Sequence, residues 1–404
     1  MLKSTTVITF ELDDIEACAS ELAKETAKNL TLMSGSFALL LCDSDVRHND
    51  LVDGLKRRLG IPIVGFSSTA MMSGADGILD AAAVLTTVTS DDVRFSVAAS
   101  EPLRAENVCE QIEATYGRAL SSLEGPPALI MAFPPCILGI TLDAYPRELG
   151  RISGGVPVFG GLPAHDDANG SSAVYCGDFA SNDRLALLLV SGAVKPVMSV
   201  RNSLSMMADL KRTVTSSRGN VIRRVGDGTF VEFLEQFGLD VKKIADAEDS
   251  NVSFSSYPLL IERANAPDDD GVLMVRSIFG VDMESGAGTA IGEVPEGSTL
   301  SLGVLRMQDI EISTKDTALG LIEKMERNCE DGYSYSVIFA ISCVARYFVM
   351  AGKSGLEADM LREMLPLGPS LSGFYSFGEI CPTSVGGHGA MNAAHNESLV
   401  LLAM

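Results

Sequence analysis

Arg346 is the side chain of this 404-residue sequence best suited to recognise an anion. It lies in an otherwise apolar run, residues 344–349, three residues after Cys343. A guanidinium in apolar surroundings requires a carboxylate or phosphate partner, because burying an unpaired charge is very costly. Two partners meet this requirement: Glu379, or the carboxylate of a bound ligand, which a planar guanidinium holds through two hydrogen bonds. The sequence leaves both open.

Cys343 is a second candidate for ligand contact, with a buried strand cysteine as the alternative. A nearby guanidinium lowers the pKa of a thiol in an electropositive, partly exposed site. Other catalytic patterns are absent from the sequence. It has four histidines, no Gly-x-Ser-x-Gly elbow and no Gly-x-x-x-x-Gly-Lys-Ser/Thr phosphate loop. We therefore predict that the protein is not an enzyme.

A Cys-Pro dipeptide near the C-terminus points to a different chemistry. Cys381 is followed by His388 and then by His395, at intervals of seven residues. Thiolate and imidazole groups are the usual axial ligands of haem iron. The sequence thus keeps haem binding by these residues as an alternative to a plain surface loop, and it predicts no other cofactor.

A unit of strand, helix, strand and strand occurs three times along the chain. Its copies comprise residues 37–42, 49–59, 60–66 and 81–88; residues 128–133, 145–152, 155–161 and 184–190; and residues 336–343, 357–365, 369–375 and 397–403. Continuous apolar strands indicate burial on both faces, and glycine in the second strand indicates close backbone approach. We predict an α/β (α+β) fold of two related halves. Each half is a mixed sheet covered by helices, and the last strand of each unit turns back antiparallel.

Polar, sulfur-bearing and glycine residues follow the strands of these units. Ligands of open α/β sheets bind beyond the carboxyl ends of the strands, so we expect ligand contacts there, with simple turns as the alternative. The candidates, besides Arg346 and Cys343, are Ser67, Thr69, Gly160, Gly161, His165, Tyr375 and Glu379. His165 and the two aspartates after it offer metal-ligand types but no defined third ligand, so we predict no metal site.

A basic segment separates the second and third copies. Its five cations are Lys211, Arg212, Arg218, Arg223 and Arg224. We place the domain boundary here, which gives domains at 1–207 and 229–404 and a connector at 208–228. A solvated connector or hairpin is one interpretation of this segment, and a docking patch for a partner is the other. Beyond it we expect a helix at 230–237, strands at 272–279, 288–291 and 299–305, and a helix at 314–329 capped by Thr314.

Composition restricts the classes of partner. The net charge of −22 opposes binding to phosphate backbones and to anionic membrane surfaces, so we expect no nucleic-acid partner. The apolar runs are too short for a membrane span, and the N-terminus has no signal-peptide pattern. Eight scattered cysteines without paired spacing indicate reduced thiols. We expect a cytoplasmic protein.

The ordered series of motifs resembles the FIST domain proteins. The segments that carry the resemblance are IPIVGFSSTAMM (61–72), GGVPVFGGLPAHDD (154–167), SSAVYCGDFASNDRLALLLVSG (171–192), FAISCVARYFVMAGKSGLEADMLREML (339–365), GFYSFGEICP (373–382) and HNESLVLL (395–402). A FIST-N part is expected near 30–205 and a FIST-C part near 220–404. The C-terminal series is the strongest portion, and it adds Asn396 to the candidate ligand-binding residues.

This resemblance implies an intracellular, non-catalytic sensory protein that binds a small molecule such as an amino acid or a related metabolite. Its expected partner is a separate signalling protein, such as a histidine kinase or a cyclic-dinucleotide enzyme. Two alternatives remain: a haem-binding nitric oxide sensor, which one branch of the family exemplifies, and an interaction scaffold without a small ligand.

Overall fold

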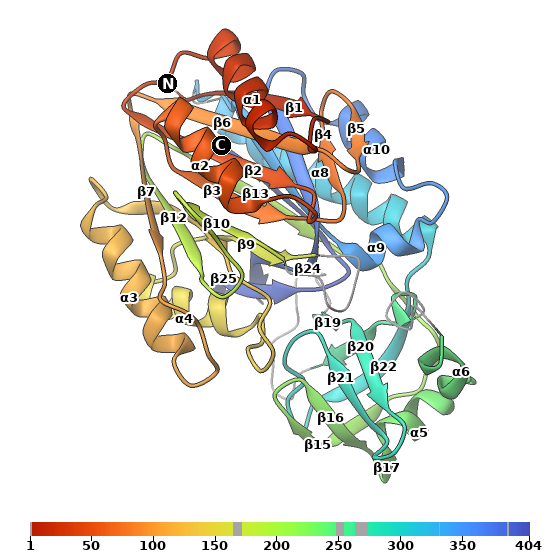
Figure 1. The fold of residues 1–404 in the computed structure, drawn as a ribbon. Helices are drawn as coiled ribbons and strands as arrows, with labels where there is room; N and C mark the ends of the chain where they lie inside the picture. The colour runs from red at the N-terminus through yellow and green to blue at the C-terminus, as the bar shows by residue number, and fades with distance from the viewer. Residues whose placement is uncertain (1, 165–171, 248–253, 263–273, 331, 386–387) are drawn as a thin grey trace.

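The chain forms a larger body and a smaller lobe. The computed structural model describes residues 2–164, 172–247, 254–262, 274–330, 332–385 and 388–404. Residues 205–304 contain the strands and helices of the lobe, drawn in green and cyan in Figure 1. Short connections at 202–204 and 305–306 join the lobe to β13 and α8 of the body.

The three repeated units are confirmed, and all three have the same strand order. In each, the first two strands pair in parallel, and the last strand pairs antiparallel with the other edge of the first. The units comprise β2 (Gly35–Cys42), α2 (His48–Leu59), β3 (Ile63–Ser67) and β6 (Ala83–Ser90); β8 (Pro127–Phe133), α4 (Ala144–Ser153), β9 (Val158–Pro163) and β12 (Ala186–Gly192); and β23 (Val337–Cys343), α9 (Val344–Val349), α10 (Leu356–Met364), β24 (Ser370–Val385) and β26 (Leu399–Ala403).

Each unit is extended by a preceding strand that pairs antiparallel with its last strand. A helix leads from that strand into the unit, directly in the first two units and after the lobe in the third. These elements are β1 (Lys3–Thr9) with α1 (Ile15–Asn29), β7 (Val93–Ala99) with α3 (Val108–Ser121), and β13 (Val197–Arg201) with α8 (Met307–Cys329).

The second and third units share one sheet, which the sequence had left undecided. The strand order is β13-β26-β23-β24-β9-β8-β12-β7, with β24 and β9 antiparallel at the join. Short strands β4 (Met71–Ser73) and β5 (Gly77–Leu79) and the long β25 (His388–His395) complete it along β24. The first unit lies in a second sheet together with β10 (Val174–Gly177) and β11 (Ala180–Ser181). Strands from both predicted domains therefore meet in one sheet.

The central core lies where the three units face one another. Phe66 of the first unit contacts Phe133 of the second and Phe374 of the third, each with ring centroids 5.2 Å apart. Alternate residues of the same strands point outward and are covered by α1 and α2, by α3 and α4, or by α8 and α10. This double coverage is the reason that the strands read as continuous apolar runs.

The lobe has its own mixed α/β composition and its own core. Its strands are β14 (Ser205–Met206), β15 (Arg212–Arg218), β16 (Val221–Val225), β17 (Gly228–Thr229), β18 (Leu259–Glu262), β19 (Met274–Arg276), β20 (Ile278–Asp282), β21 (Ala287–Ala290) and β22 (Thr299–Val304), and its helices are α5 (Phe230–Glu235) and α6 (Val241–Ala245). The basic segment forms the β15–β16 hairpin, and its five cations are exposed. A docking role for this hairpin stays a prediction.

Helix α8 begins at Met307, seven residues before the position predicted from Thr314. The carboxylate of Asp309 accepts a hydrogen bond from the backbone N–H of Arg306, 3.0 Å away, and so caps the first turn. Thr314 lies fully buried inside the helix instead. Within the described residues, no helix is long and apolar enough to cross a membrane.

A glycine at the same place in each unit explains the close approach of the parallel strands. Gly65, Gly160 and Gly373 pair with Leu40, Ala132 and Ala340. A Cβ at these glycines would lie 2.0, 2.0 and 2.5 Å from the paired carbonyl oxygen. No side chain fits at such distances, so these glycines are required by strand packing.

We expect Gly160→Ala to destabilise the protein by about 1–3 kcal/mol, because the added methyl group forces two buried strands apart. Gly280→Ala in β20 is the matched control, since its Cβ would meet nothing within 4 Å. Urea unfolding of both variants measures the difference. Equal stability of the two would contradict the proposed packing constraint.

Candidate functional site

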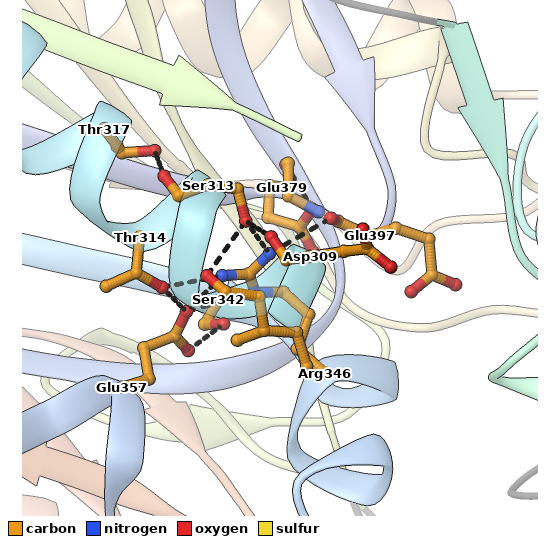
Figure 2. Close-up of polar contacts among 11 residues, drawn as sticks. Asp309, Ser313, Thr314, Thr317, Ser342, Arg346, Glu357, Glu379 and Glu397 are labelled. Carbon is orange, nitrogen blue, oxygen red and sulfur yellow. Dashed lines mark hydrogen bonds and ion pairs between the residues drawn. The ribbon is translucent and has the colours of Figure 1, made fainter. Parts of the chain in front are cut away.

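Arg346 is fully buried at the carboxyl end of β23, in the short helix α9. Its Nε donates to Glu357 Oε1 at 3.0 Å, and Nη2 also contacts that oxygen. Nη1 and Nη2 donate to Ser313 Oγ (2.9 Å) and Thr314 Oγ1 (3.0 Å) of α8. Figure 2 shows these groups converging on the guanidinium. All three nitrogens are engaged within the protein.

Glu357, rather than Glu379, is the carboxylate that pairs with Arg346. Its side chain is fully buried at the first turn of α10. Its second oxygen accepts from Ser342 Oγ at 2.5 Å. Sequence reasoning missed this residue because helical acids are usually solvated. The available signal was its spacing from Leu361, since residues four apart share a helix face and Leu361 is buried in the core.

Glu379 lies in β24 and is also completely buried. Its Oε2 accepts from Ser398 Oγ at 2.7 Å, and Ser376 Oγ lies 3.3 Å from its Oε1. Burial raises the pKa of Glu379 to about 8, the Glu397 carboxylate adds to the rise, and the Ser398 hydrogen bonds oppose it. Glu379 is therefore mainly protonated at neutral pH.

Asn396 and Glu397 form the turn between β25 and β26, and both side chains are at most 1% exposed. Glu397 Oε1 accepts from Ser277 Oγ of the lobe at 2.6 Å. Its Oε2 has no hydrogen-bond partner among the described residues. The same is true of the Oδ1 and Nδ2 atoms of Asn396. Burial raises the pKa of Glu397 to about 7. The turn therefore presents buried polar groups that the protein leaves unsatisfied.

Cys343 lies beside this turn, its backbone N–H donating to the carbonyl of Ser398 at 3.0 Å, but its environment differs from that of an activated thiol. Burial raises the pKa of the Cys343 thiol well above its usual value, and Glu379 and Glu397 reinforce the shift. The thiol is consequently neutral near neutral pH, because burial disfavours its charged form. Tyr375 is buried, with its ring 5.1 Å from that of Tyr347. Burial raises its pKa well above the usual value.

Among the candidates from the first half of the chain, Ser67 and the two glycines have structural contacts, whereas the Oγ1 of Thr69 is buried without a hydrogen-bond partner among the described residues. Ser67 Oγ accepts from the backbone N–H of Ala173 at 2.7 Å, and Thr69 is half-buried between β3 and β4. Gly161 pairs with Glu379, which places both glycines beside the candidate site. A Cβ on Gly160 or Gly161 would meet backbone oxygens, so strand packing explains both. His165 lies outside the described residues.

Of the residues considered for haem, the side chains of Cys381 and His395 are described, and both make hydrogen bonds within the protein. Cys381 and His388 lie in paired strands rather than in a loop. Burial raises the pKa of Cys381 to about 12, which disfavours the thiolate that iron requires. Burial lowers the pKa of His395 to about 4, and its Nε2 lies 3.0 Å from the Cys381 carbonyl oxygen. Burial of Cys381 and His395 disfavours axial ligation by these two side chains, while haem binding as such stays an untested prediction. No cluster of three metal-binding side chains occurs among the described residues.

The lobe meets the body at this site. Arg276 of β19 donates to Asp143, before α4, at 2.6 Å in a buried ion pair. Glu293 reinforces the contact through its backbone N–H, 2.8 Å from Asp143 Oδ2, and through its carboxylate, which pairs with Arg147. These charged residues carried no sequence signal, since their partners lie more than a hundred positions away.

A small cavity of about 30 Å³ lies between the lobe and the body. Its walls combine lobe residues with residues at the end of β23, in α9 and in β24. They are Ser255, Ser277, Ile278, Phe279, Ile291, Cys343, Val344, Ala345, Phe348 and Phe377. Because Ser277 lines the cavity and donates to Glu397, the buried turn lies directly behind the cavity wall. We call this region the junction site.

Comparison with known proteins gives matches to two family models. The FIST N domain model matches residues 3–227, and the FIST C domain model matches residues 233–382. No curated protein matches the chain. Among solved structures, the cyanuric acid hydrolase from A. caulinodans is 10% identical, with a TM-score of 0.33 over 100% of this chain and 99% of the other. A second cyanuric acid hydrolase structure is 9% identical, with a TM-score of 0.31 over 76% of this chain and 100% of the other. Because both identities and both TM-scores are low, we infer nothing about this chain from these two structures.

We expect Glu357→Gln to destabilise the protein by about 3–5 kcal/mol, because it leaves the buried Arg346 guanidinium without a counter-charge. Asp359→Asn on the same helix is the control. It breaks only the surface pair with Arg362 and should cost less than about 1 kcal/mol. Chemical unfolding compares the two variants, and similar losses would argue against the buried pair as a major stabilising contact.

The raised pKa of Glu379 predicts a dependence of stability on pH. The folded state keeps a proton that the unfolded chain releases near pH 4.5, so the free energy of unfolding falls as pH rises toward 8. The expected slope between about pH 6.5 and 8 is at most about 1.4 kcal/mol per pH unit for this group. Glu379→Gln should reduce the slope, with the exposed Glu326→Gln as charge control. An unchanged slope in Glu379→Gln would contradict the assignment.

Proposed function

The chain belongs to the family of FIST domain proteins, whose domains are sensory domains of signal-transduction proteins, and on this premise we propose that it is a non-catalytic cytoplasmic sensor. In this proposal the protein binds a small molecule, an amino acid or a related metabolite, at the junction site. It then passes the signal to a separate signalling protein, such as a histidine kinase or a cyclic-dinucleotide enzyme.

The observation that carries the proposal is the unsatisfied turn at Asn396 and Glu397. Buried polar atoms in folded proteins nearly always have hydrogen-bond partners, and leaving one unpaired costs about 1–3 kcal/mol. Here three such atoms occur on consecutive residues behind the wall of a cavity. A ligand that enters the junction and supplies their partners would recover this free energy.

The chemistry of the junction supports binding rather than catalysis. The Cys343 thiol is neutral, and His395 is held against a backbone carbonyl with its pKa lowered by burial. Neither group is therefore prepared to act as a nucleophile or a general base near neutral pH.

The position of the site suggests how binding is transmitted. The lobe contributes Ser277 and Phe279 to the junction, and the body contributes Phe348 and Phe377. A ligand between them acts directly on the angle between lobe and body, because two short connections join the parts. The partner protein would read the resulting change of surface.

A thermal-shift screen with amino acids and related metabolites tests the proposal. A ligand at a hundredfold excess over its dissociation constant stabilises the folded state by about 2.7 kcal/mol and raises the melting temperature. Phe279→Ala, at the junction, should weaken the response, whereas Phe10→Ala should not. Both phenylalanines are largely exposed, at 48% and 65%, so the variants are matched.

Two outcomes would count against this function. Absence of any stabilising compound among amino acids and metabolites would leave no support for a small-molecule sensor. An equal loss of response in both variants would place the ligand elsewhere than the junction.

A further inference from the structure

The carboxyl groups beside the junction, Glu379 and Glu397, have no cationic side chain paired with them among the described residues. Arg346, which contacts the turn, has its counter-charge in Glu357 on the opposite side, as Figure 2 shows. Toward the turn, it donates only to the backbone carbonyl of Glu397, at 3.5 Å. Glu379 and Glu397 thus have no cation paired with them among the described residues. Arg276, next to Ser277, forms its ion pair with Asp143 instead.

The unpaired oxygen of Glu397, Oε2, is a hydrogen-bond acceptor with no donor among the described residues. A carboxylate accepts but does not donate, so a partner for Oε2 must carry an N–H or O–H group. A cationic donor fits best, because it supplies the missing positive charge together with the hydrogen bond. The pKa of Glu397, raised by burial to about 7, agrees with a carboxylate that lacks such a partner.

The backbone holds Glu397 in place at a strained conformation. Its φ is +57°, in the left-handed region that bulky residues rarely adopt. The neighbouring contacts fix it there: Arg346 donates to its carbonyl, and the N–H and hydroxyl of Ser398 donate to Glu379. Non-glycine residues held in this region often mark ligand-binding or active sites.

Asn396 provides a second, independent group. Within the part of the chain that the structure describes, both its side-chain polar atoms lack hydrogen-bond partners, although the residue is 1% exposed. Its Nδ2 lies 3.1 Å from the point where Gly378 would carry a Cβ, so only glycine there leaves the amide its space. Phe377, the preceding residue, lines the cavity. Asn396 does not itself line the cavity, but its amide packs against the residue that follows the cavity-lining Phe377 and offers both a donor and an acceptor.

The remaining walls of the cavity are mainly apolar. Ile278, Phe279 and Ile291 approach from the lobe, and Val344, Phe348 and Phe377 approach from the body. At about 30 Å³, the cavity holds only one or two molecules of the size of water. A ligand with several carbon atoms requires the lobe to move outward, which the connections at 202–204 and 305–306 allow.

We propose that the junction site is specific for small apolar amines, with the ammonium group bound by Glu397 and Asn396 and the hydrocarbon part held between the phenylalanines of lobe and body. This inference rests on the proposed function and narrows it. It places a positively charged nitrogen, rather than a carboxylate, at the centre of recognition.

Three probes with the same branched carbon skeleton test the charge requirement: isobutylamine, isobutyramide and isobutyrate. Isothermal titration of the full-length protein at about pH 8 keeps Glu397 ionised and the amine protonated. We expect isobutylamine to bind about tenfold or more tightly than either of the other probes. Equal affinity for the three, tighter binding of isobutyrate, or no binding of the amine overturns the inference. The proposed function survives any of these results if the metabolite screen yields another junction ligand.

Asn396→Leu separates a binding role from a structural one. Since Asn396 has no partner in the free protein, the apolar substitution should leave the melting temperature unchanged or raise it, and amine binding should fall about tenfold or more. Asn392→Leu in β25 is the matched control. Its amide is fully bonded, to the N–H of Val158 and the carbonyl of Val156, each at 2.9 Å, so this variant should lose stability.

Glu397→Gln provides the second test of the contact. The substitution keeps the size of the side chain and its bond from Ser277 but removes the negative charge. We expect this variant to keep a native circular dichroism spectrum. Its affinity for the amine should fall by about tenfold or more. Unchanged amine affinity in both Glu397→Gln and Asn396→Leu overturns the assignment of the binding residues.

Discussion

The buried ion pair between Arg346 and Glu357 is the contact on which the C-terminal half depends. It joins helices α8, α9 and α10 with the end of β23 and the carbonyl of Glu397. An ion pair without water stabilises only when every hydrogen bond is made, and here the hydroxyls of Ser313, Thr314 and Ser342 complete the set. Because the pair neutralises itself, it leaves the neighbouring carboxyls of the junction without a cation.

The three repeated units show how far a local pattern predicts a fold. Apolar runs, amphipathic helices and the glycine of each second strand predicted the succession of strand, helix, strand and antiparallel strand within a unit, because these features act over a few dozen residues. The joining of β24 to β9 was not predictable in this way. It depends on edges of two units that are more than two hundred residues apart.

Sequence reasoning singled out some of the residues that meet at the junction site and missed others. Arg346 and Cys343 were found because a cation or thiol at the end of an apolar strand is visible in the sequence. Glu357 was missed, since an acid in an amphipathic helix looks solvated until its partner is known. The lobe residues Arg276 and Ser277 were missed for the same reason, as both contact segments more than a hundred residues away.

The sequence by itself determined the repeated unit, the mixed α/β class, the family and the need of Arg346 for a carboxylate. These follow from residue type and short-range spacing. Only the tertiary structure decided which carboxylate that is, and that the turn at Asn396 and Glu397 is buried but unsatisfied. Pairing and burial depend on which segments pack together: α8 and α10 enclose the guanidinium of Arg346, and the lobe reaches the turn through Ser277. The unsatisfied atoms, rather than the net charge of −22, are the observation on which the proposed ligand chemistry rests.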